Sequence, residues 1–213
     1  MQARIGIRHA AVSPALEGTP RGAALKAALA TAGVPLAEMD DRALAGLADT
    51  EHPQGVIAVI EPPSWTLDRL TPRAGEVVVV LDGVQDPGNV GAIARTALGL
   101  GASGLIALKG TAELTNPKVL RGSMGALFRL PAVSATDAEC LAWTKRVGAA
   151  LWITDSDGER PGGQRPTAPV ALVLGNEGAG VRPELEREAS RRLAIPLSAG
   201  VESLNVAVAA GIL

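Results

Sequence analysis

The chain has 213 residues, 47% of them hydrophobic, which excludes a disordered chain and predicts one or two domains with a buried core. Its 20 basic and 22 acidic residues give a net charge of −2, which excludes a histone-like nucleic-acid binder. Sixteen of the basic residues are arginines, however, and their forked side chains suit a local phosphate site. The four aromatic residues are too few to favour a base-stacking platform.

The single cysteine, Cys140, excludes an internal disulfide framework and a multi-cysteine zinc site. It lies in an apolar helical stretch, so we expect a buried, inert thiol. His9 and His52 do not have metal-ligand spacing, and no metal is expected. No apolar run is long enough to span a membrane and the N-terminus does not read as a signal peptide. We therefore expect a soluble, cytoplasmic protein.

Residues 1–61 predict a small α/β domain. Alanine and leucine dominate residues 23–32, which predicts a helix that ends at a glycine, and a second helix is expected at 41–47. Residues 54–60 form an apolar run typical of a strand. Residues 62–75 contain three prolines and predict a linker.

From residue 76 to residue 213, short apolar runs alternate with helical patterns. Strands that are apolar on both faces and alternate with helices indicate a parallel sheet covered on both sides, and ligands bind such sheets at the carboxyl ends of the strands. The expected strands are 77–81, 105–108, 151–154, 170–174 and 193–197, and the expected helices are 90–99, 117–127, 137–148, 183–192 and a last helix from about 204.

Polar side chains follow the first of these strands. Asn89 falls at the mouth of the helix 90–99, where a side chain caps free N–H groups and an anion is favoured. Arg95 lies off the apolar stripe of the same helix. Taken alone, the pattern favours a helix cap for Asn89 and a solvated surface charge for Arg95.

Two further loops carry candidate residues. Three glycines surround the carboxylate of Glu177 within residues 174–180, a pattern that suits either close approach of a ligand or a tight turn. Ser203 is a candidate N-cap of the last helix. The G-x-G-x-x-G run at 99–104 closes a helix instead of opening one, which argues against a dinucleotide site.

Together these loops resemble the three ordered motifs of SpoU/TrmH-type RNA 2′-O-methyltransferases of the SPOUT class. The resemblance rests on Asn89 and Arg95 after a strand, on Leu-Gly-Asn-Glu-Gly at 174–178, and on Ile-Pro-Leu at 195–197 followed by Ser-Leu-Asn-Val at 203–206. Residues 116–125 also resemble the family's segment between its first two motifs, so that the likeness covers about residues 76–213. Residues 1–61 look like the later part of the family's N-terminal RNA-binding domain, which is similar to ribosomal proteins that bind kinked RNA.

This resemblance implies a methyltransferase domain at 76–213 with a deep trefoil knot at its C-terminus, preceded by an incomplete N-terminal RNA-binding domain. It implies S-adenosyl-L-methionine as the cofactor, no metal, and a homodimer with each active site near the subunit boundary. The cofactor-binding residues that it implies are Leu174, Gly175, Ile195, Leu197 and Leu204. Relatives also carry a longer closing helix than the eight residues that follow Asn205.

The implied reaction is attack by a ribose 2′-hydroxyl on the methyl group of the donor. The family's usual proposal makes Arg95 the base, but guanidinium groups stay protonated in proteins, so we expect Arg95 and Asn89 to clamp the target phosphate instead. Glu177 is expected to orient Arg95 or its loop, and Ser203 and Asn205 are expected to hold the nucleophile or the knot loop. In a dimer, Ser203 is expected to act beside the partner's Arg95.

The leading hypothesis is therefore methylation of ribose in 23S ribosomal RNA. A transfer-RNA substrate and a non-catalytic RNA-binding assembly factor on the same scaffold remain alternatives. A nicotinamide-dependent oxidoreductase is a third alternative, against which the misplaced glycine run counts.

Overall fold

The computed structural model describes residues 5–163 and 166–213. The chain divides into two compact units, residues 1–63 and residues 64–213. Within the described part of the chain, no helix has the length and apolar character needed to cross a membrane.

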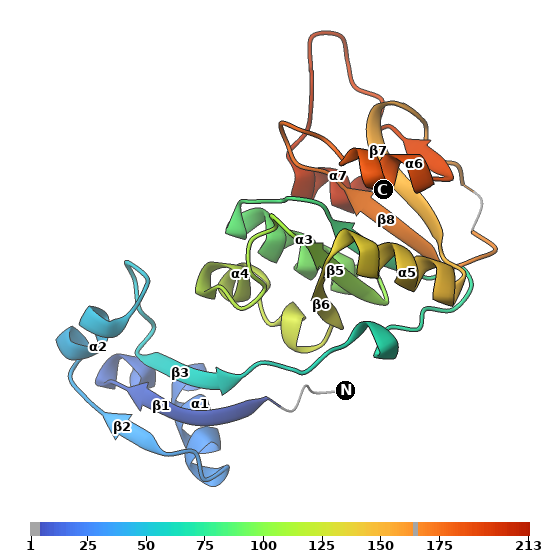
Figure 1. The fold of residues 1–213 in the computed structure, drawn as a ribbon. Helices are drawn as coiled ribbons and strands as arrows, with labels where there is room; N and C mark the ends of the chain where they lie inside the picture. The colour runs from blue at the N-terminus through green and yellow to red at the C-terminus, as the bar shows by residue number, and fades with distance from the viewer. Residues whose placement is uncertain (1–4, 164–165) are drawn as a thin grey trace. The chain divides into compact units, whose positions relative to one another are not determined.

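The first unit contains a three-stranded sheet with the strand order β2-β1-β3 (Figure 1). β1 runs parallel to β2 and antiparallel to β3. The sequence analysis missed β1 and β2, because β1 carries charged and half-exposed positions and β2 has only three residues. The expected small α/β domain is present. Its elements are β1 (Gly6–Val12), η1 (Pro14–Gly18), α1 (Pro20–Thr31), β2 (Leu36–Glu38), α2 (Asp41–Leu47) and β3 (Val56–Glu61).

The second unit is built on a six-stranded sheet with the order β6-β5-β4-β8-β7-β9. All five neighbouring pairs are parallel, which confirms the predicted architecture. Because every strand points the same way, the loops that follow β4, β5, β8 and β9 meet at one edge. The strands are β4 (Val77–Leu81), β5 (Gly104–Leu108), β6 (Ala132–Ala135), β7 (Ala150–Glu159), β8 (Val170–Leu174) and β9 (Arg191–Leu193).

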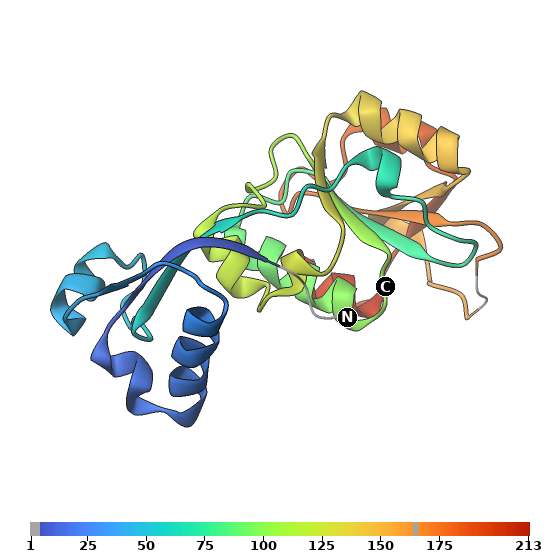
Figure 2. The same cartoon turned by 90° about the horizontal axis from the view of Figure 1, so that it is seen from below.

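Helices cover both faces of this sheet (Figure 2). The side chains of Val79 and Leu81 pack with α3, α4 and α7 on one face, and those of Val78 and Val80 pack with α5 and α6 on the other. Two core layers therefore enclose the central strands. The helices are η2 (Leu67–Arg69), α3 (Pro87–Gly99), α4 (Pro117–Gly122), η3 (Ala126–Phe128), α5 (Asp137–Val147), α6 (Pro183–Glu188) and α7 (Val206–Ile212).

Several predicted elements differ from the structure in their bounds. The strand expected at 193–197 ends at Leu193, just before the Ile-Pro-Leu run, in which proline has no N–H for a sheet ladder. The helix expected at 117–127 breaks into α4 and η3, because Met124 and Gly125 both take positive φ angles. β6 was not predicted, and α6 ends at Glu188, four residues earlier than expected.

The core between the sheet and α5 includes the only cysteine. Cys140 is fully buried, and burial together with the charges of Asp137 and Asp82 raises the pKa of its thiol to about 12. The predicted burial of this thiol is confirmed. Leu70, in the segment expected as a linker, is also buried here and accepts a 2.8 Å hydrogen bond from the indole of Trp143.

Close approach of α3 and α4 depends on glycine. A Cβ on Gly91 would lie 2.7 Å from the carbonyl oxygen of Val119 and 2.9 Å from the backbone of Gly122. We expect Gly91→Ala to lower the free energy of unfolding by about 2 kcal/mol, because the two backbones must move apart. Gly99→Ala, in the same helix with open space around it, is the matched control and should gain roughly 0.5 kcal/mol. Denaturant titration of both variants tests this, and equal effects would contradict the packing argument.

Candidate active site

A chain of three side chains joins loops from distant parts of the sequence at the carboxyl edge of the sheet. Asn205 Nδ2 donates to Asn89 Oδ1 at 3.0 Å, and Asn89 Nδ2 donates to Glu177 Oε1 at 2.5 Å. These bonds tie the start of α7 to α3 and to the loop after β8. The structure thus brings together three of the five predicted catalytic residues.

The donor-to-acceptor direction of these two hydrogen bonds is fixed at both ends. Asn205 Oδ1 accepts from the backbone N–H groups of Ala207 and Val208 at the start of α7, so its amide nitrogen must face Asn89. At the other end, the Glu177 carboxylate only accepts. One amide hydrogen of Asn89 is therefore committed to Glu177, and the second is available to a ligand.

Both helix caps differ from the prediction. Asp86 caps α3 by accepting from the backbone N–H of Asn89 at 2.8 Å, so Asn89 lies inside the helix rather than at its cap. Asn205, and not Ser203, caps α7. Asp86 was missed because the sequence analysis began this helix at residue 90, three residues after its start. The side chain of Asn89 is consequently released from capping and reaches Glu177.

Arg95 and Ser203 stand apart from this chain of hydrogen bonds. Arg95 is exposed, six residues after Asn89 and therefore about 9 Å further along α3. Among the described residues, neither the guanidinium of Arg95 nor the hydroxyl of Ser203 has a hydrogen-bond partner. Gly88, Gly91 and Arg95 share one row of the helix, and Gly88 and Gly91 pack on α4. Arg95 consequently lies beside the α4 side of the site.

The loop after β8 is held by a residue that the sequence analysis did not select. Asn176 Oδ1 accepts from the backbone of Gly178 and Ala179 at 2.9 Å, and its Nδ2 donates to the Gly83 carbonyl at 2.7 Å. A Cβ on Gly175 would lie 2.5 Å from the backbone of Gly180. Gly175 is therefore required for the tight turn itself, and Leu174 is fully buried at the end of β8.

The segment after β9 leaves backbone groups open. Within the described residues, the N–H and C=O groups of Ile195, Leu197 and Leu204 make no hydrogen bond. Ile195 and Leu204 are half-buried, and polar backbone groups in such places require a partner. The segment therefore offers free backbone donors and acceptors beside apolar side chains.

An ion-pair network lies at the same edge of the sheet, and the sequence analysis did not predict it. Arg182 donates to Asp82 from its backbone N–H at 2.8 Å and from its guanidinium at 2.6 Å. It also reaches Asp137 at 2.6 Å and the Lys109 carbonyl at 2.7 Å. Burial lowers the pKa of Arg182, but the hydrogen bonds and charges of Asp137 and Asp82 outweigh burial and raise it above the usual value. Asp82 follows β4 directly, a position that could have flagged it.

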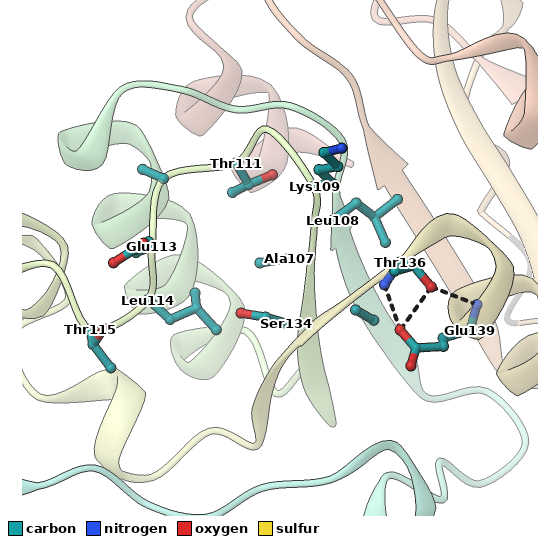
Figure 3. A pocket seen from close by; sticks show the side chains of 12 residues that line it. Ala107, Leu108, Lys109, Thr111, Glu113, Leu114, Thr115, Ser134, Thr136 and Glu139 are labelled. Carbon is teal, nitrogen blue, oxygen red and sulfur yellow. Dashed lines mark hydrogen bonds between the residues drawn. The ribbon is translucent and has the colours of Figure 1, made fainter.

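A cavity of about 520 Å³ opens at the carboxyl ends of β5 and β6 (Figure 3). Thr136 and Glu139, on its wall, are tied to each other by a capping box, and none of the ten predicted site residues lines the cavity. In the described part of the chain, no three His, Cys, Asp or Glu residues are grouped so that they could hold a metal ion.

Comparison with known proteins explains this arrangement. A family model described as the SpoU rRNA methylase family matches residues 76–213, which include all ten predicted site residues. The chain belongs to the SpoU rRNA methylase family. A second family model, RNA 2′-O ribose methyltransferase substrate binding, matches residues 2–66. The resemblance predicted from the motifs is confirmed.

Members of the SpoU family align along most of the chain. It is 35% identical over 182 residues to the 23S rRNA (guanosine(2553)-2′-O)-methyltransferase RlmP of Bacillus subtilis, covering 85% of this chain and 71% of that protein. It is 37% identical to the 23S rRNA (uridine(2479)-2′-O)-methyltransferase of Streptomyces viridochromogenes, covering 75% of this chain but only 58% of that protein. An AdoMet-bound rRNA methyltransferase from Sinorhizobium meliloti superposes with a TM-score of 0.84 at 32% identity, covering 99% of this chain and 78% of that one.

Proposed function

We propose that the chain is an S-adenosylmethionine-dependent methyltransferase that modifies a ribose 2′-hydroxyl of 23S ribosomal RNA. The observation that carries this proposal is the Asn205–Asn89–Glu177 chain of hydrogen bonds, which joins all three family motifs. The names of RlmP and of the Streptomyces enzyme support ribosomal RNA over transfer RNA.

The residues of the segment after β9 fit this cofactor. The adenine of S-adenosylmethionine needs hydrogen-bond donors and acceptors along one edge and apolar contacts on its faces. The backbone groups and side chains of Ile195, Leu197 and Leu204 offer both. Gly175 keeps the facing turn free of a side chain. When bound, the cofactor supplies an electrophilic methyl group.

The other site residues bind and orient the RNA. The fork of Arg95 and the free amide hydrogen of Asn89 hold the phosphate of the target nucleotide, which fixes its ribose in the attacking geometry. Glu177 acts through Asn89 as a positioning residue, because it sets the direction in which the amide points. Asn205 serves the same purpose from the other side, while capping α7.

Subunit arrangement, knot and RNA binding by the first unit belong to the same proposal. We propose a homodimer in which Ser203 lies beside the partner's Arg95, a trefoil knot formed by the segments near 170–180, 193–203 and 204–213, and an RNA-binding first unit. The match of residues 2–66 to the substrate-binding family supports the last of these. Action in the cytoplasm follows from a ribosomal substrate.

The cofactor site is tested by Leu197→Glu. Leu197 is 38% exposed, so the substitution costs little folding free energy, but it places a carboxylate against the adenine. We expect S-adenosylmethionine to bind about ten-fold more weakly or worse, measured by isothermal titration. Leu47→Glu, at an exposed leucine of the first unit, is the control and should leave the affinity unchanged.

The reaction is tested with wild-type protein, labelled S-adenosylmethionine and either 23S ribosomal RNA or bulk transfer RNA. We expect label in ribosomal RNA and a 2′-O-methyl group at one mapped nucleotide. Label in transfer RNA alone would show that the substrate is transfer RNA and not ribosomal RNA. RNA binding by folded protein that binds no cofactor would establish an assembly factor instead.

A further inference from the structure

One exposed residue takes a backbone conformation that opposes its own side chain. Met124 has a φ of +50° and is the only non-glycine residue with positive φ in the described part of the chain. It follows Ser123, the C-cap of α4, and so holds the position where helices most often end in glycine. A left-handed conformation is unfavourable for a side chain that carries a Cβ.

Packing does not compensate for this cost. Met124 is 73% exposed, the largest exposed fraction among the large apolar residues that the structure describes as exposed. The backbone around it is firmly held, because Met124 N–H donates to the Arg121 carbonyl at 3.1 Å and Ala126 N–H donates to the Ser123 carbonyl at 2.9 Å. Ser123 is buried beneath it. The turn therefore presents an apolar side chain to solvent from a rigid base.

The sequence around Met124 is basic. Residues 114–136 contain no Asp or Glu, whereas Lys118, Arg121 and Arg129 lie within them and are exposed. The end of α4 also touches the first turns of α3, where a Cβ on Gly122 would lie 3.4 Å from Gly91 Cα. Gly91 shares its row of α3 with Arg95. Met124 thus lies on the helix pair that carries the phosphate clamp, in a region suited to a polyanion.

We propose that Met124 contacts the substrate RNA, packing its thioether against an unstacked base near the nucleotide to be methylated. The inference rests on the proposed function and adds a residue for substrate binding to it. Methionine side chains are flexible, polarizable and suited to the face of a ring, and apolar side chains at such sites wedge between bases. An exposed methionine can serve in this way in a chain that has four aromatic residues.

The test compares Met124→Gly, Met124→Ala and Met124→Leu. Glycine removes the side chain and relieves the backbone, so we expect the melting temperature to rise by about 2 °C while KM for RNA rises about five- to ten-fold. Alanine should raise KM equally without the gain in melting temperature. Leucine should restore most of the RNA affinity. Cofactor affinity and kcat should stay unchanged in all three variants.

Leu100→Ala is the control, because Leu100 is 71% exposed and this substitution removes a similar apolar surface at another position. The control should leave KM for RNA unchanged. An unchanged KM in Met124→Gly would overturn the proposal. Dissociation of a dimer by that variant in sedimentation would overturn it too, because Met124 would then be a subunit contact. Direct binding of 23S RNA fragments decides the matter separately from catalysis. If wild-type protein binds RNA but transfers no methyl group, the proposed reaction is wrong. The Met124 contact is then tested by whether Met124→Gly weakens this RNA binding.

Discussion

Replacement of Arg95 by lysine is expected to lower kcat/KM for methyl transfer to RNA by about 10²-fold. Arg95 is exposed and has no partner among the described residues, so its side chain has no task in holding the fold. A guanidinium grips a phosphate through two parallel hydrogen bonds, whereas an ammonium is a single point charge. Loss of that geometry misplaces the ribose, and small misplacements of a reacting group cost about this much.

Melting temperature and cofactor affinity should not change in Arg95→Lys, which separates this effect from unfolding. Arg187→Lys, at an exposed arginine with one weak ion pair to Glu184, is the control and should keep full activity. Near-normal turnover and RNA affinity in Arg95→Lys would rule out both the phosphate clamp and a base at this position. Recovery of the rate only at alkaline pH would instead assign the proton transfer to residue 95.

The helices and strands that are most completely buried were predicted best. β4 and β8 match their predicted bounds, since both are continuous apolar runs enclosed by helices on both faces. β1 was missed because only some of its seven positions face a core. The break at Met124 was missed because its residue type opposes the backbone that it adopts. Local pattern succeeds where burial is complete and fails where the backbone departs from the residue's own preference.

In the site, the sequence predicted single residues but not the contacts between residues far apart in the chain. The motifs identified Asn89, Glu177 and Asn205, but not that Asn89 bridges the other two across 88 and 116 residues. The pairing of Asp82 with Arg182, 100 residues apart, has no signal in spacing at all. The position of Asp82 directly after β4 marked it as a loop candidate, but its partner follows the neighbouring strand β8 and could not be read from the local sequence.

That pairing gives the second large effect. Asp82 is only 3% exposed, and Arg182 is the cation that faces it, at 2.6 Å. The same guanidinium reaches Asp137 and the Lys109 carbonyl, so that one side chain ties together the ends of β4 and β5, the start of α5 and the loop after β8. Its removal leaves a buried carboxylate without a counter-charge, which costs far more than the loss of a surface pair.

We therefore expect Arg182→Met to lower the free energy of unfolding by about 3 kcal/mol, measured by denaturant titration. Methionine keeps most of the unbranched apolar stem and the backbone N–H bond to Asp82, so the loss chiefly reports the charge and the hydrogen bonds of the guanidinium. Arg187→Met, in α6, the helix that Arg182 precedes as its N-cap, is the matched control and should change stability by less than about 0.5 kcal/mol. Since Asp82 is the group left unpaired, Asp82→Asn combined with Arg182→Met should recover part of the loss. No recovery in the double variant would show that Arg182 acts through Asp137 or packing instead of through the buried charge.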